Sequence, residues 1–470
     1  MTEANGQGCP GCASLLKRIE ELEARLAQLE AELAKARKNS RNSSKPPSSD
    51  IVNPPPNGSG KTRSKRKRGG QPGHPRHERP PFSEDQIDKV WEYRYSGCPC
   101  CGGELQDIDL EPKKLQQVEI LAQPIRVEEH RRVAQRCAAC QQVHYAELPP
   151  ELVKAGLVGP RLTALVGFFK GACHMSFSSI RKFLRDVVGL NISRGQLRNL
   201  VAKVSDSIED PYKELLGLLP DEQRLNVDET GHKDNGDRLW TWCFRAAMFT
   251  LFKISPSRGS DVLLEVLGKE FDGVVGCDYF SAYRKYMRLN ENVMLQFCLA
   301  HLIRDVKFLA EHPNARNRAY GRRLLEHLRQ LFGIIHRRDE YASPVSFRRA
   351  LERVRDELVW AATVDSPHTQ EALNLEERFY QDTESYFRFI STPDVEATNN
   401  LAEQAIRFVT IHRRLTQGTR GEWGQTWCER IWTVIASCAQ QGRSVFAYLC
   451  EAVQAQFASR PAPSLAPNTS

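Results

Sequence analysis

Three acidic residues in the second half of the chain occupy settings that suit phosphoryl transfer. Asp228 ends a strand-like run at 224–228, and Asp278 ends another at 274–278. Glu403 lies in a helix-like stretch. Two strand-end carboxylates and one helix carboxylate can converge on a pair of Mg²⁺ or Mn²⁺ ions about 4 Å apart, which stabilise the attacking and leaving oxygens of an in-line displacement. We therefore predict that these three residues are catalytic and hold two divalent ions.

Each of these residues also has a plainer interpretation. An isolated Asp at a strand end is usually a turn residue or a helix cap. Glu229 adjoins Asp228. Because successive residues of a strand face opposite sides of the sheet, only one of these two carboxylates should face the metals. Three other acidic residues are alternatives for the third ligand: Asp305, Glu422 and Glu429.

Polar neighbours could support such a site. Asn399, Asn400 and Arg407 share the helical neighbourhood of Glu403. Arg407 follows Glu403 by one helical turn, where its guanidinium could balance the carboxylate or hold a phosphate. Two further polar residues follow the last predicted strand, His301 and Arg304. Phosphate positioning and ordinary core or surface packing explain this pair equally well.

The surrounding pattern predicts the elements that would bring the carboxylates together. Runs rich in aromatic and β-branched residues predict five strands, with a turn at 235–237 between the first two. The strands are expected at 224–228, 239–246, 248–254, 274–278 and 294–298, and helices at 261–268 and 299–310. An RNase H-like fold requires this order and places the first and fourth strands side by side, which would bring Asp228 and Asp278 together. The Arg-rich stretch from about 312 to 390 would be a helical insertion before the helix of Glu403.

Beyond these local patterns, the chain resembles transposases of the insertion-sequence-66 family. Four strings carry the resemblance: VDETG at 227–231, DYFSAY at 278–283, CLAHLIRD at 298–305 and NNLAE at 399–403. A further match covers 418–444, and together these matches span nearly the whole chain in the family's order. Gln404 stands where the family pattern commonly has Arg. The family motif falls on Glu403, which favours it over the three alternatives as the third ligand.

The resemblance implies a DDE transposase with an RNase H-like core. Such an enzyme cleaves double-stranded DNA at the terminal inverted repeats of a transposon and joins the freed 3′-OH to target DNA, without a covalent protein intermediate. Two other functions stay open, a DNA-binding regulator without catalysis and an RNase H-like nuclease without strand transfer. The complete acidic set argues against the first, and the long N-terminal half argues against the second. Helper proteins encoded by the element are further candidate partners.

Length and composition limit the class of protein. At 470 residues the chain should form about three domains. No stretch approaches the ~20 apolar residues of a membrane span, and residues 1–6 lack the basic-then-apolar pattern of a secretory signal. We therefore expect a protein of the bacterial cytoplasm, associated with the nucleoid and without a membrane partner. In that compartment, the paired spacings among the 14 cysteines favour zinc over disulfides.

The N-terminal segment has the pattern of a coiled coil over 14–38. Apolar residues recur at spacings of four and three, with Glu, Lys and Arg between them: Leu15, Ile19, Leu22, Leu26, Leu29, Leu33 and Ala36. We favour a homo-oligomer through this seam over a helix packed on its own chain. Residues 39–90 then have the composition of a disordered linker. Its basic run can neutralise DNA phosphates, with a merely solvated tail as the alternative: Lys61, Arg63, Lys65, Arg66, Lys67 and Arg68.

Residues 91–148 carry two Cys-x-x-Cys pairs that predict a zinc-binding domain. The pairs are Cys98 with Cys101 and Cys137 with Cys140, and Cys100 is the spare cysteine between the first two. Four thiolates at ~2.3 Å make a closed tetrahedral structural site for Zn²⁺. The family also carries a zinc-binding domain here, and a reduced, metal-free segment is the alternative. An alternating run at 117–121 suggests a strand between the pairs.

Helices are predicted on both sides of the catalytic core. Residues 150–220 should be helical, and two short helices around a Gly turn admit either a helix-turn-helix or ordinary packing. In the first case three residues would read DNA: Arg194, Gln196 and Arg198. A helical region at 411–455, with its tryptophans packed on the core, and a disordered tail at 460–470 follow.

The predicted architecture is thus multidomain α+β. It joins an N-terminal coiled coil, a zinc-binding domain and a helical domain to an RNase H-like α/β catalytic core at 222–410, with the helical insertion inside that core.

Overall fold

The computed structural model describes residues 10–38, 42, 80–96, 98–104, 114–121 and 124–467. Contacts divide the chain into two units, residues 57–130 and a larger unit of residues 1–56 and 131–470, and each is described by itself. The basic run from Lys61 to Arg68 lies outside the described residues. In the described part of the smaller unit, the regular element is the 3-10 helix η2 (Glu84–Gln86). The strand expected at 117–121 is not formed, since an alternating run becomes a strand only where another edge pairs with it.

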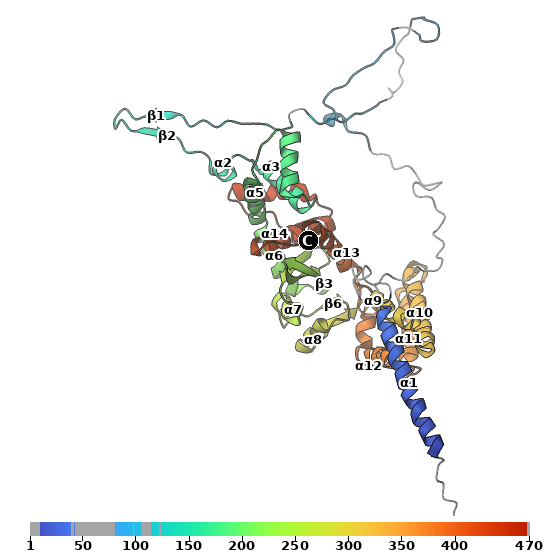
Figure 1. Cartoon of the computed structure of the whole chain (residues 1–470). Coiled ribbons are helices and arrows are strands. Elements are labelled where there is room, and N and C mark those ends of the chain that lie inside the picture. The colour runs from blue at the N-terminus through green and yellow to red at the C-terminus, as the bar shows by residue number, and fades with distance from the viewer. Residues whose placement is uncertain are drawn as a thin grey trace, which may run out of the picture. The chain divides into compact units, whose positions relative to one another are not determined.

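The larger unit is mixed α+β with a helical majority (Figure 1). Before the sheet lie α1 (Pro10–Ala36), the hairpin of β1 (Ala134–Arg136) and β2 (Val143–Tyr145), α2 (Pro150–Ala155), α3 (Pro160–Gly171), α4 (Phe177–Phe183), the π-helix η3 (Leu184–Val188), α5 (Arg194–Ser207), α6 (Glu209–Leu218) and η4 (Leu219–Asp221). Within and after the sheet lie α7 (Ser260–Leu267), α8 (Ser281–Leu289), α9 (Leu299–Ala310), α10 (Ala315–His336), η5 (Arg338–Glu340), α11 (Pro344–Thr363), α12 (Gln370–Ser391), α13 (Asn400–Thr416), α14 (Glu422–Gln440) and α15 (Val445–Phe457).

A five-stranded mixed sheet carries the core of this unit. Its strands are β3 (Arg224–Asp234), β4 (Asp237–Arg245), β5 (Thr250–Ser255), β6 (Val274–Cys277) and β7 (Met294–Phe297). The order across the sheet is β5-β4-β3-β6-β7, with β3, β4 and β5 antiparallel and β6 and β7 parallel to β3. All five predicted strands are present, and the predicted pairing of the first strand with the fourth is confirmed. Every residue of β6 is buried, as a central parallel strand requires.

The first strand is longer than its sequence predicted. We placed its end at Asp228, but β3 continues to Asp234, so Asp228 lies within the strand. The polar residues after Asp228 remain in the strand because their backbone groups pair with β4 as far as the pair Asp234 and Asp237. Asn235 and Gly236 close this hairpin with φ of 50° and 101°. A two-residue turn of this kind suits the right-handed twist of the two strands.

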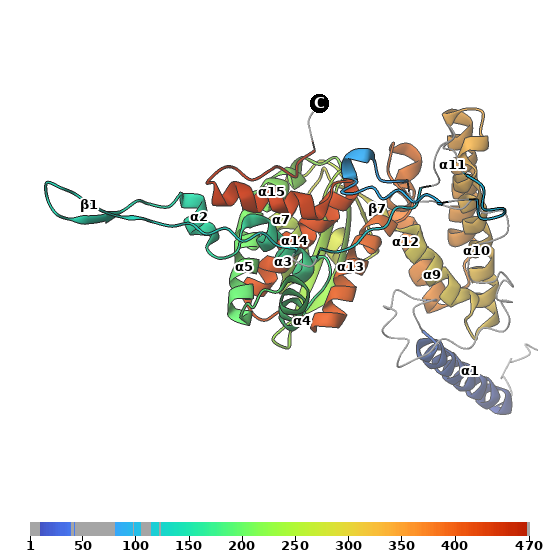
Figure 2. The ribbon, with the colours of Figure 1, turned by 90° about the horizontal axis from the view of Figure 1, so that it is seen from above.

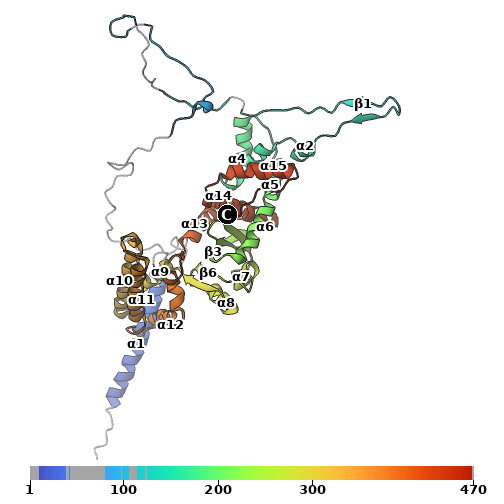
Figure 3. The same cartoon turned by 180° about the vertical axis from the view of Figure 1, so that it is seen from behind.

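The helical insertion covers the β7 edge of the sheet. Helices α10, α11 and α12 pack on one another, and α10 and α12 also pack on α9, in the region predicted to be inserted (Figure 3). The side chain of Gln296 in β7 joins the last of them to the sheet. Its Nε2 donates to the carbonyl of Tyr386 at 3.1 Å, and its Oε1 accepts from the amide of Phe389 at 2.8 Å. The insertion is therefore hydrogen-bonded to an outer strand.

The opposite edge strand, β5, is covered by α14. Three α14 side chains accept hydrogen bonds from alternate β5 amides: Ser437 from Thr250 at 3.1 Å, Thr433 from Phe252 at 3.0 Å and Glu429 from Ile254 at 2.6 Å. Four residues of helix and two of strand advance by similar lengths, about 6.0 and 6.7 Å. The side chains of α14 thus replace a neighbouring strand on the outer edge of β5.

Helices α2 to α6 form a second layer with α14 and α15 (Figure 2). We expected no stretch long enough to cross a membrane, yet 150–171 passes that test by length and composition alone. The stretch consists of two helices, α2 and α3, and α3 packs against α5 and α15. A core helix of this kind satisfies the same test.

The predicted disordered tail is wrong for residues 460–467. Leu465 is fully buried, and its carbonyl accepts from Gln441 Nε2 at 2.8 Å. The carbonyl of Pro463 accepts from the Tyr448 hydroxyl at 2.8 Å. The Pro- and Ala-rich composition indicated disorder, but one leucine with several backbone acceptors suffices to dock the segment on α14 and α15.

The α1 helix leaves its apolar seam exposed. The six leucine and isoleucine residues that define the predicted coiled coil are 43 to 65% exposed: Leu15, Ile19, Leu22, Leu26, Leu29 and Leu33. The helix is present as predicted, whereas a coiled coil needs a partner helix against this seam.

A histidine pair, with His412 buried and His174 half-buried, joins the helical layer to α13. His174, between α3 and α4, lies with its Nδ1 3.0 Å from Nδ1 of His412. One ring must donate and the other accept, so the pair cannot hold a proton on all four nitrogens. Burial, followed by the charges of His174 and Lys170, lowers the pKa of His412 to about 3.

We predict that acid weakens this fold through His412. Its folded pKa of about 3 lies below the ordinary value of 6.5. The contribution of neutral His412 to the free energy of unfolding is therefore fully present above pH 6.5. It is lost as the pH falls, because the unfolded chain binds a proton at this histidine and the folded chain does not. Between pH 6.5 and about 5 the free energy of unfolding should fall by about 2 kcal/mol from this residue. Chemical denaturation at both pH values should show that the free energy of unfolding of His412→Gln falls by about 2 kcal/mol less than that of the wild type. His336→Gln, which removes an exposed histidine, should lose as much as the wild type. Equal pH slopes for all three proteins would contradict the prediction.

Candidate functional site

The alternation of β3 sends its two adjacent acidic residues to opposite faces. Asn226 and Asp228 are half-buried on one face, and Val227 and Glu229 are buried on the other. Asp278 follows β6, the neighbour of β3, by one residue. Each aspartate has one oxygen fixed by a backbone amide, Asp228 Oδ1 by Glu229 and Asp278 Oδ1 by Phe280, both at 2.9 Å. The other oxygen of each carboxyl is free of these amides.

Asn399 attaches α13 to the Asp228 face of the sheet. Its Nδ2 donates to the carbonyl of Val227 at 2.8 Å, and its Oδ1 accepts from Asn226 Nδ2 at 2.9 Å. Its backbone amide donates to the Cys298 sulfur at 3.1 Å, at the start of α9. The asparagine is 2% exposed, so it is a positioning residue rather than a contact for a ligand. Sequence analysis placed it beside Glu403 without this role.

A missing side chain on β6 makes room for this attachment. Gly276 is the register partner of Asn226. A Cβ at Gly276 would lie 2.6 Å from Asn226 Nδ2, which is too close for any carbon. Asn226 and Gly276 are functional positions that sequence analysis missed, although the two-residue step from Asn226 to Asp228 was a usable signal, because it puts both on one face.

Glu403 lies in the first turn of α13, one turn after Asn399. Its amide donates to the Asn399 carbonyl at 3.2 Å, the first hydrogen bond of the helix. Its Oε1 lies 3.6 Å from His301 Nδ1, and its Oε2 lies 3.7 Å from Arg304 Nη2. Burial, followed by the charge of Arg304, lowers the pKa of His301 to about 4. His301 is therefore neutral near pH 7, and Arg304 is the cation that faces Glu403.

The other predicted acidic residues act electrostatically on Asp228. Burial raises the pKa of Asp228 well above its ordinary value, and the charges of Glu229, Asp278 and Glu403 raise it further. Burial also raises the pKa of Asp278, against the lowering effects of the Phe280 amide and Arg258. Crowded carboxylates with raised pKa values are short of positive charge. Divalent cations with a preference for oxygen ligands would supply that charge, so the residues fit the two ions that we predicted.

Glu229 forms a buried cluster on the other face. Arg258 reaches its Oε1 with Nη2 at 2.7 Å and Nε at 2.8 Å, and the Tyr283 hydroxyl donates to Oε2 at 2.5 Å. Burial and the charge of Asp278 nevertheless raise the pKa of Glu229 to about 7. Arg258 also packs over the Phe280 ring at 4.0 Å, so this cluster supports the loop after Asp278. Sequence analysis missed this arrangement because its members are far apart in the chain.

The three alternatives for the third acidic position have other surroundings. Glu429 accepts from β5, and Asp305 pairs with Arg378 at 2.8 Å. Glu422 is exposed in the first turn of α14. Two supporting residues predicted near Glu403, Asn400 and Arg407, are exposed as well. Among the described residues, the ion contacts of Glu403 are to His301 and Arg304 rather than to Arg407.

The insertion contacts the residue that follows Asp278. The Tyr279 hydroxyl donates to Asp382 Oδ2 of α12 at 2.7 Å. Two guanidinium groups lie over the Tyr279 ring, Arg284 at 4.3 Å and Arg378 at 4.4 Å. Burial and the hydrogen bond to Asp382 raise the pKa of Tyr279 to about 12. The position of the Asp278 loop therefore depends on α12.

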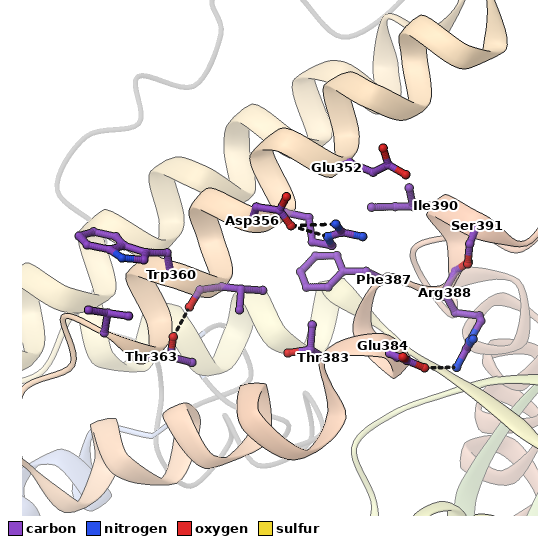
Figure 4. Close-up of a pocket in the computed structure, with 13 residues that line it drawn as sticks. Glu352, Asp356, Trp360, Thr363, Thr383, Glu384, Phe387, Arg388, Ile390 and Ser391 are labelled. Carbon is purple, nitrogen blue, oxygen red and sulfur yellow. Dashed lines mark hydrogen bonds and ion pairs between the residues drawn. The ribbon is translucent and has the colours of Figure 1, made fainter.

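A pocket of about 640 Å³ lies within the insertion, away from the carboxylates (Figure 4). It is lined by α11 and α12, and the exposed ring of Trp360 is part of its wall. Its two arginines are already paired with acidic residues, Arg355 with Asp356 at 2.8 Å and Arg388 with Glu384 at 3.2 Å. The lining therefore offers no unpaired cation for a phosphate.

The candidate DNA-reading residues start at the N-terminus of α5. Ser193 caps this helix, as its position predicted, by accepting from the Gln196 amide at 3.1 Å. Arg194 is exposed and Gln196 is half-buried. Arg198 lies over the Trp423 ring at 4.6 Å, which favours packing for this arginine. Of the other tryptophans expected in the core, Trp427 and Trp432 are buried.

The two Cys-x-x-Cys loops have the same backbone geometry. In each, the amide of the first cysteine donates to the carbonyl five residues on, Gly103 for Cys98 and Gln142 for Cys137, at 2.8 and 2.9 Å. The first cysteine's carbonyl accepts from the fourth following residue, Gly102 or Gln141, and both of these have positive φ. Backbone amides of Cys100 and Cys140, respectively, are the largest influences that lower the pKa of Cys98 and Cys137. Each loop thus favours a thiolate, and since the loops belong to separate units, each is described alone.

Comparison with known proteins adds three findings. The family model described as the transposase IS66 family matches residues 155–426, more than half of the chain. A family of unknown function, DUF6444, matches residues 11–80. Over 380 residues the chain is 23% identical to the uncharacterized protein y4qI of Sinorhizobium fredii, with 73% of this chain and 67% of that protein covered.

Proposed function

The chain belongs to the transposase IS66 family, and we propose that it cleaves DNA at transposon ends and joins the freed 3′-OH to target DNA by two-metal phosphoryl transfer. The observation that supports the proposal is the raised pKa of Asp228, to which the charges of Asp278 and Glu403 contribute from the end of the neighbouring strand and from α13. Membership of a transposase family implies DNA as the partner; the two chemical steps are our inference.

The three carboxylates would act as ligands for Mg²⁺ or Mn²⁺. Asn399 holds the start of α13, which carries Glu403, on the strand of Asp228, and Arg258 and Tyr283 support the Asp278 loop through Glu229. Bound divalent ions would activate a water or 3′-OH and stabilise the leaving oxygen. Arg304 and the exposed Arg407 lie on the two helices nearest Glu403 and suit the phosphates on either side of the reacting one.

A nuclease without strand transfer would need the same carboxylates. Chemistry at the metal ions therefore does not separate the two functions. A regulator without catalysis would not need an acidic cluster whose burial and repulsion destabilise the fold. The cluster favours an enzyme, and its family favours joining as well as cleavage.

We predict that Asp228→Ala, Asp278→Ala and Glu403→Ala each lose at least about 100-fold in cleavage and joining of end-containing DNA. Each removes a metal ligand, and the ions need all three. DNA binding in a gel-shift assay should change little. Glu422→Ala is the matched control, because it removes an exposed carboxylate at another helix N-terminus. Full activity in the three variants, or loss in Glu422→Ala alone, would contradict the assignment.

Stability gives the same prediction an independent readout. Without divalent ions, Asp228→Asn should unfold at a higher temperature than wild type, because it removes one of several repelling charges. The gain should disappear when Mg²⁺ is added, since only the wild type binds the ions fully. A lower unfolding temperature without metal would show that the carboxylates do not repel one another.

We also propose that Cys98, Cys101, Cys137 and Cys140 share one structural Zn²⁺. The identical loop geometry and the lowered pKa values of Cys98 and Cys137 support thiolate ligation in both loops. Purified Cys101→Ser and Cys140→Ser should each contain about one zinc equivalent less than wild type, by elemental analysis. Cys100→Ser, which alters the spare cysteine, should keep it. Undiminished zinc in both variants would disprove the shared site.

The exposed seam of α1 supports a homo-oligomer through residues 14–38. Deleting residues 10–38 should lower the particle mass in light scattering to that of a smaller assembly, because the seam is exposed on the chain itself. Leu26→Glu should have the same effect by placing a charge in the seam, whereas Gln28→Glu, outside it, should not. An unchanged mass after the deletion would exclude this segment as the oligomerisation element.

A further inference from the structure

A second group of metal-binding side chains meets at Glu403. Cys298 precedes α9, His301 is in its first turn, and Glu403 is in the first turn of α13. One ligand atom from each of the three lies within 4.8 Å of the others. Asp228 and Asp278 are not members of this group, so it is distinct from the pair of aspartates.

Two polar atoms in this group face each other without a hydrogen bond. His301 Nδ1 and Glu403 Oε1 are buried, and neither has a hydrogen-bond partner among the described residues. They are 3.6 Å apart, which is beyond hydrogen-bonding distance. Buried polar atoms are nearly always satisfied, so such a pair calls for a missing partner.

The separation of these atoms suits two ligands of one ion. Ligands at about 2.0–2.1 Å from a tetrahedral Zn²⁺ lie roughly 3.4 Å from each other, and a sulfur at ~2.3 Å lies slightly farther. The observed 3.6 Å between His301 Nδ1 and Glu403 Oε1 is close to that value. These two atoms thus already have the separation of two ligands, and the Cys298 sulfur lies within 4.8 Å of a ligand atom of each residue.

The side chain of Cys298 is fixed in place for such a role. Its sulfur accepts the amide of Asn399 at 3.1 Å, and Asn399 is itself attached to β3 through Val227. The same residue therefore orients the sulfur at the start of α9 and the carboxylate one turn along α13. A hydrogen bond from a backbone amide to a sulfur also stabilises the negative charge that a metal-binding thiolate carries.

The donor set selects the kind of ion. Sulfur, imidazole nitrogen and a carboxylate oxygen are ligands of Zn²⁺ and related ions, whereas Mg²⁺ takes oxygen ligands in octahedral geometry. Three protein ligands leave a fourth tetrahedral position open. The ligands Cys298, His301 and Glu403 therefore favour Zn²⁺ over the Mg²⁺ that we expect at Asp228 and Asp278.

We propose that Cys298, His301 and Glu403 bind one Zn²⁺ ion beside the Mg²⁺ site, and that this ion inhibits the enzyme by occupying Glu403. The binding stands on the geometry alone, whereas the inhibition rests on the proposed function of Glu403 in DNA cleavage. Zinc excess would then switch off strand cleavage by withdrawing Glu403 from the ligands of the Mg²⁺ ions.

Cobalt provides a test that does not depend on activity. Full-length protein with its zinc loops loaded is titrated with Co²⁺, and thiolate-to-cobalt charge transfer is followed by absorption. The wild type should bind one more Co²⁺ than Cys298→Ser or His301→Ala. Cys277→Ser is the matched control, since Cys277 is buried on β6 nearby but outside the group. Cys298→Ser keeps an oxygen that can accept the Asn399 amide, and circular dichroism verifies that it folds.

Identical cobalt spectra for wild type and Cys298→Ser would overturn the site, whether or not the protein cleaves DNA. Cobalt binding lost in Cys298→Ser and His301→Ala and retained in Cys277→Ser would support it even if cleavage is never seen.

The inhibition has its own measurement. The Zn²⁺ concentration that halves Mg²⁺-dependent cleavage should rise by roughly 10-fold or more in Cys298→Ser, relative to that variant's own zinc-free rate. An unchanged concentration would overturn the inhibitory role and leave the cobalt result to decide the site.

Discussion

The placement of Asn399 is the constraint on which the rest of this site depends. A helix carboxylate can join two strand carboxylates only if the helix is fixed along its axis and in its rotation. Asn399 does both, because its side chain bonds to β3 and its backbone amide bonds to the residue before α9. Three elements that are distant in sequence, β3, α9 and α13, thereby share one small polar junction. Gly276 permits it by leaving room for Asn226.

The junction holds groups that repel one another. Burial and like charges raise the pKa of Asp228 and of Asp278, and the nearby histidine is neutral near pH 7. The fold therefore holds several acidic groups near Asp228, against the general tendency to pair buried charges. Such an arrangement persists only where the surrounding packing fixes it, here through the buried sheet and the Glu229–Arg258–Tyr283 cluster. The same rigidity keeps the carboxylates ready for cations.

Sequence patterns predicted the strands, their order and the neighbouring positions of Asp228 and Asp278, because strand periodicity and the parallel pairing of β3 with β6 are local and topological properties. They did not predict the continuation of β3 to Asp234, since backbone pairing with β4 overrides a polar sequence. The role of Asn399 needs three contacts from separate parts of the chain, and the docking of Leu465 needs a surface that only the folded α14 and α15 provide. The choice of Glu403 as the third ligand rested on the family motif rather than on strand or helix periodicity, and it stays a prediction.

Both outer edges of the five-stranded sheet are covered by helices rather than by strands. Gln296 joins β7 to the insertion, and Glu429, Thr433 and Ser437 join β5 to α14. Four residues of helix advance by about 6.0 Å and two residues of strand by about 6.7 Å, so the side chains of α14 stay aligned with the amides of β5 over only a few repeats. Helix α14 can consequently engage β5 in one register, and sliding it by a single residue would break all three bonds. Neither edge of this five-stranded sheet is left for a strand of another molecule, so the sheet is shielded from edge-to-edge aggregation.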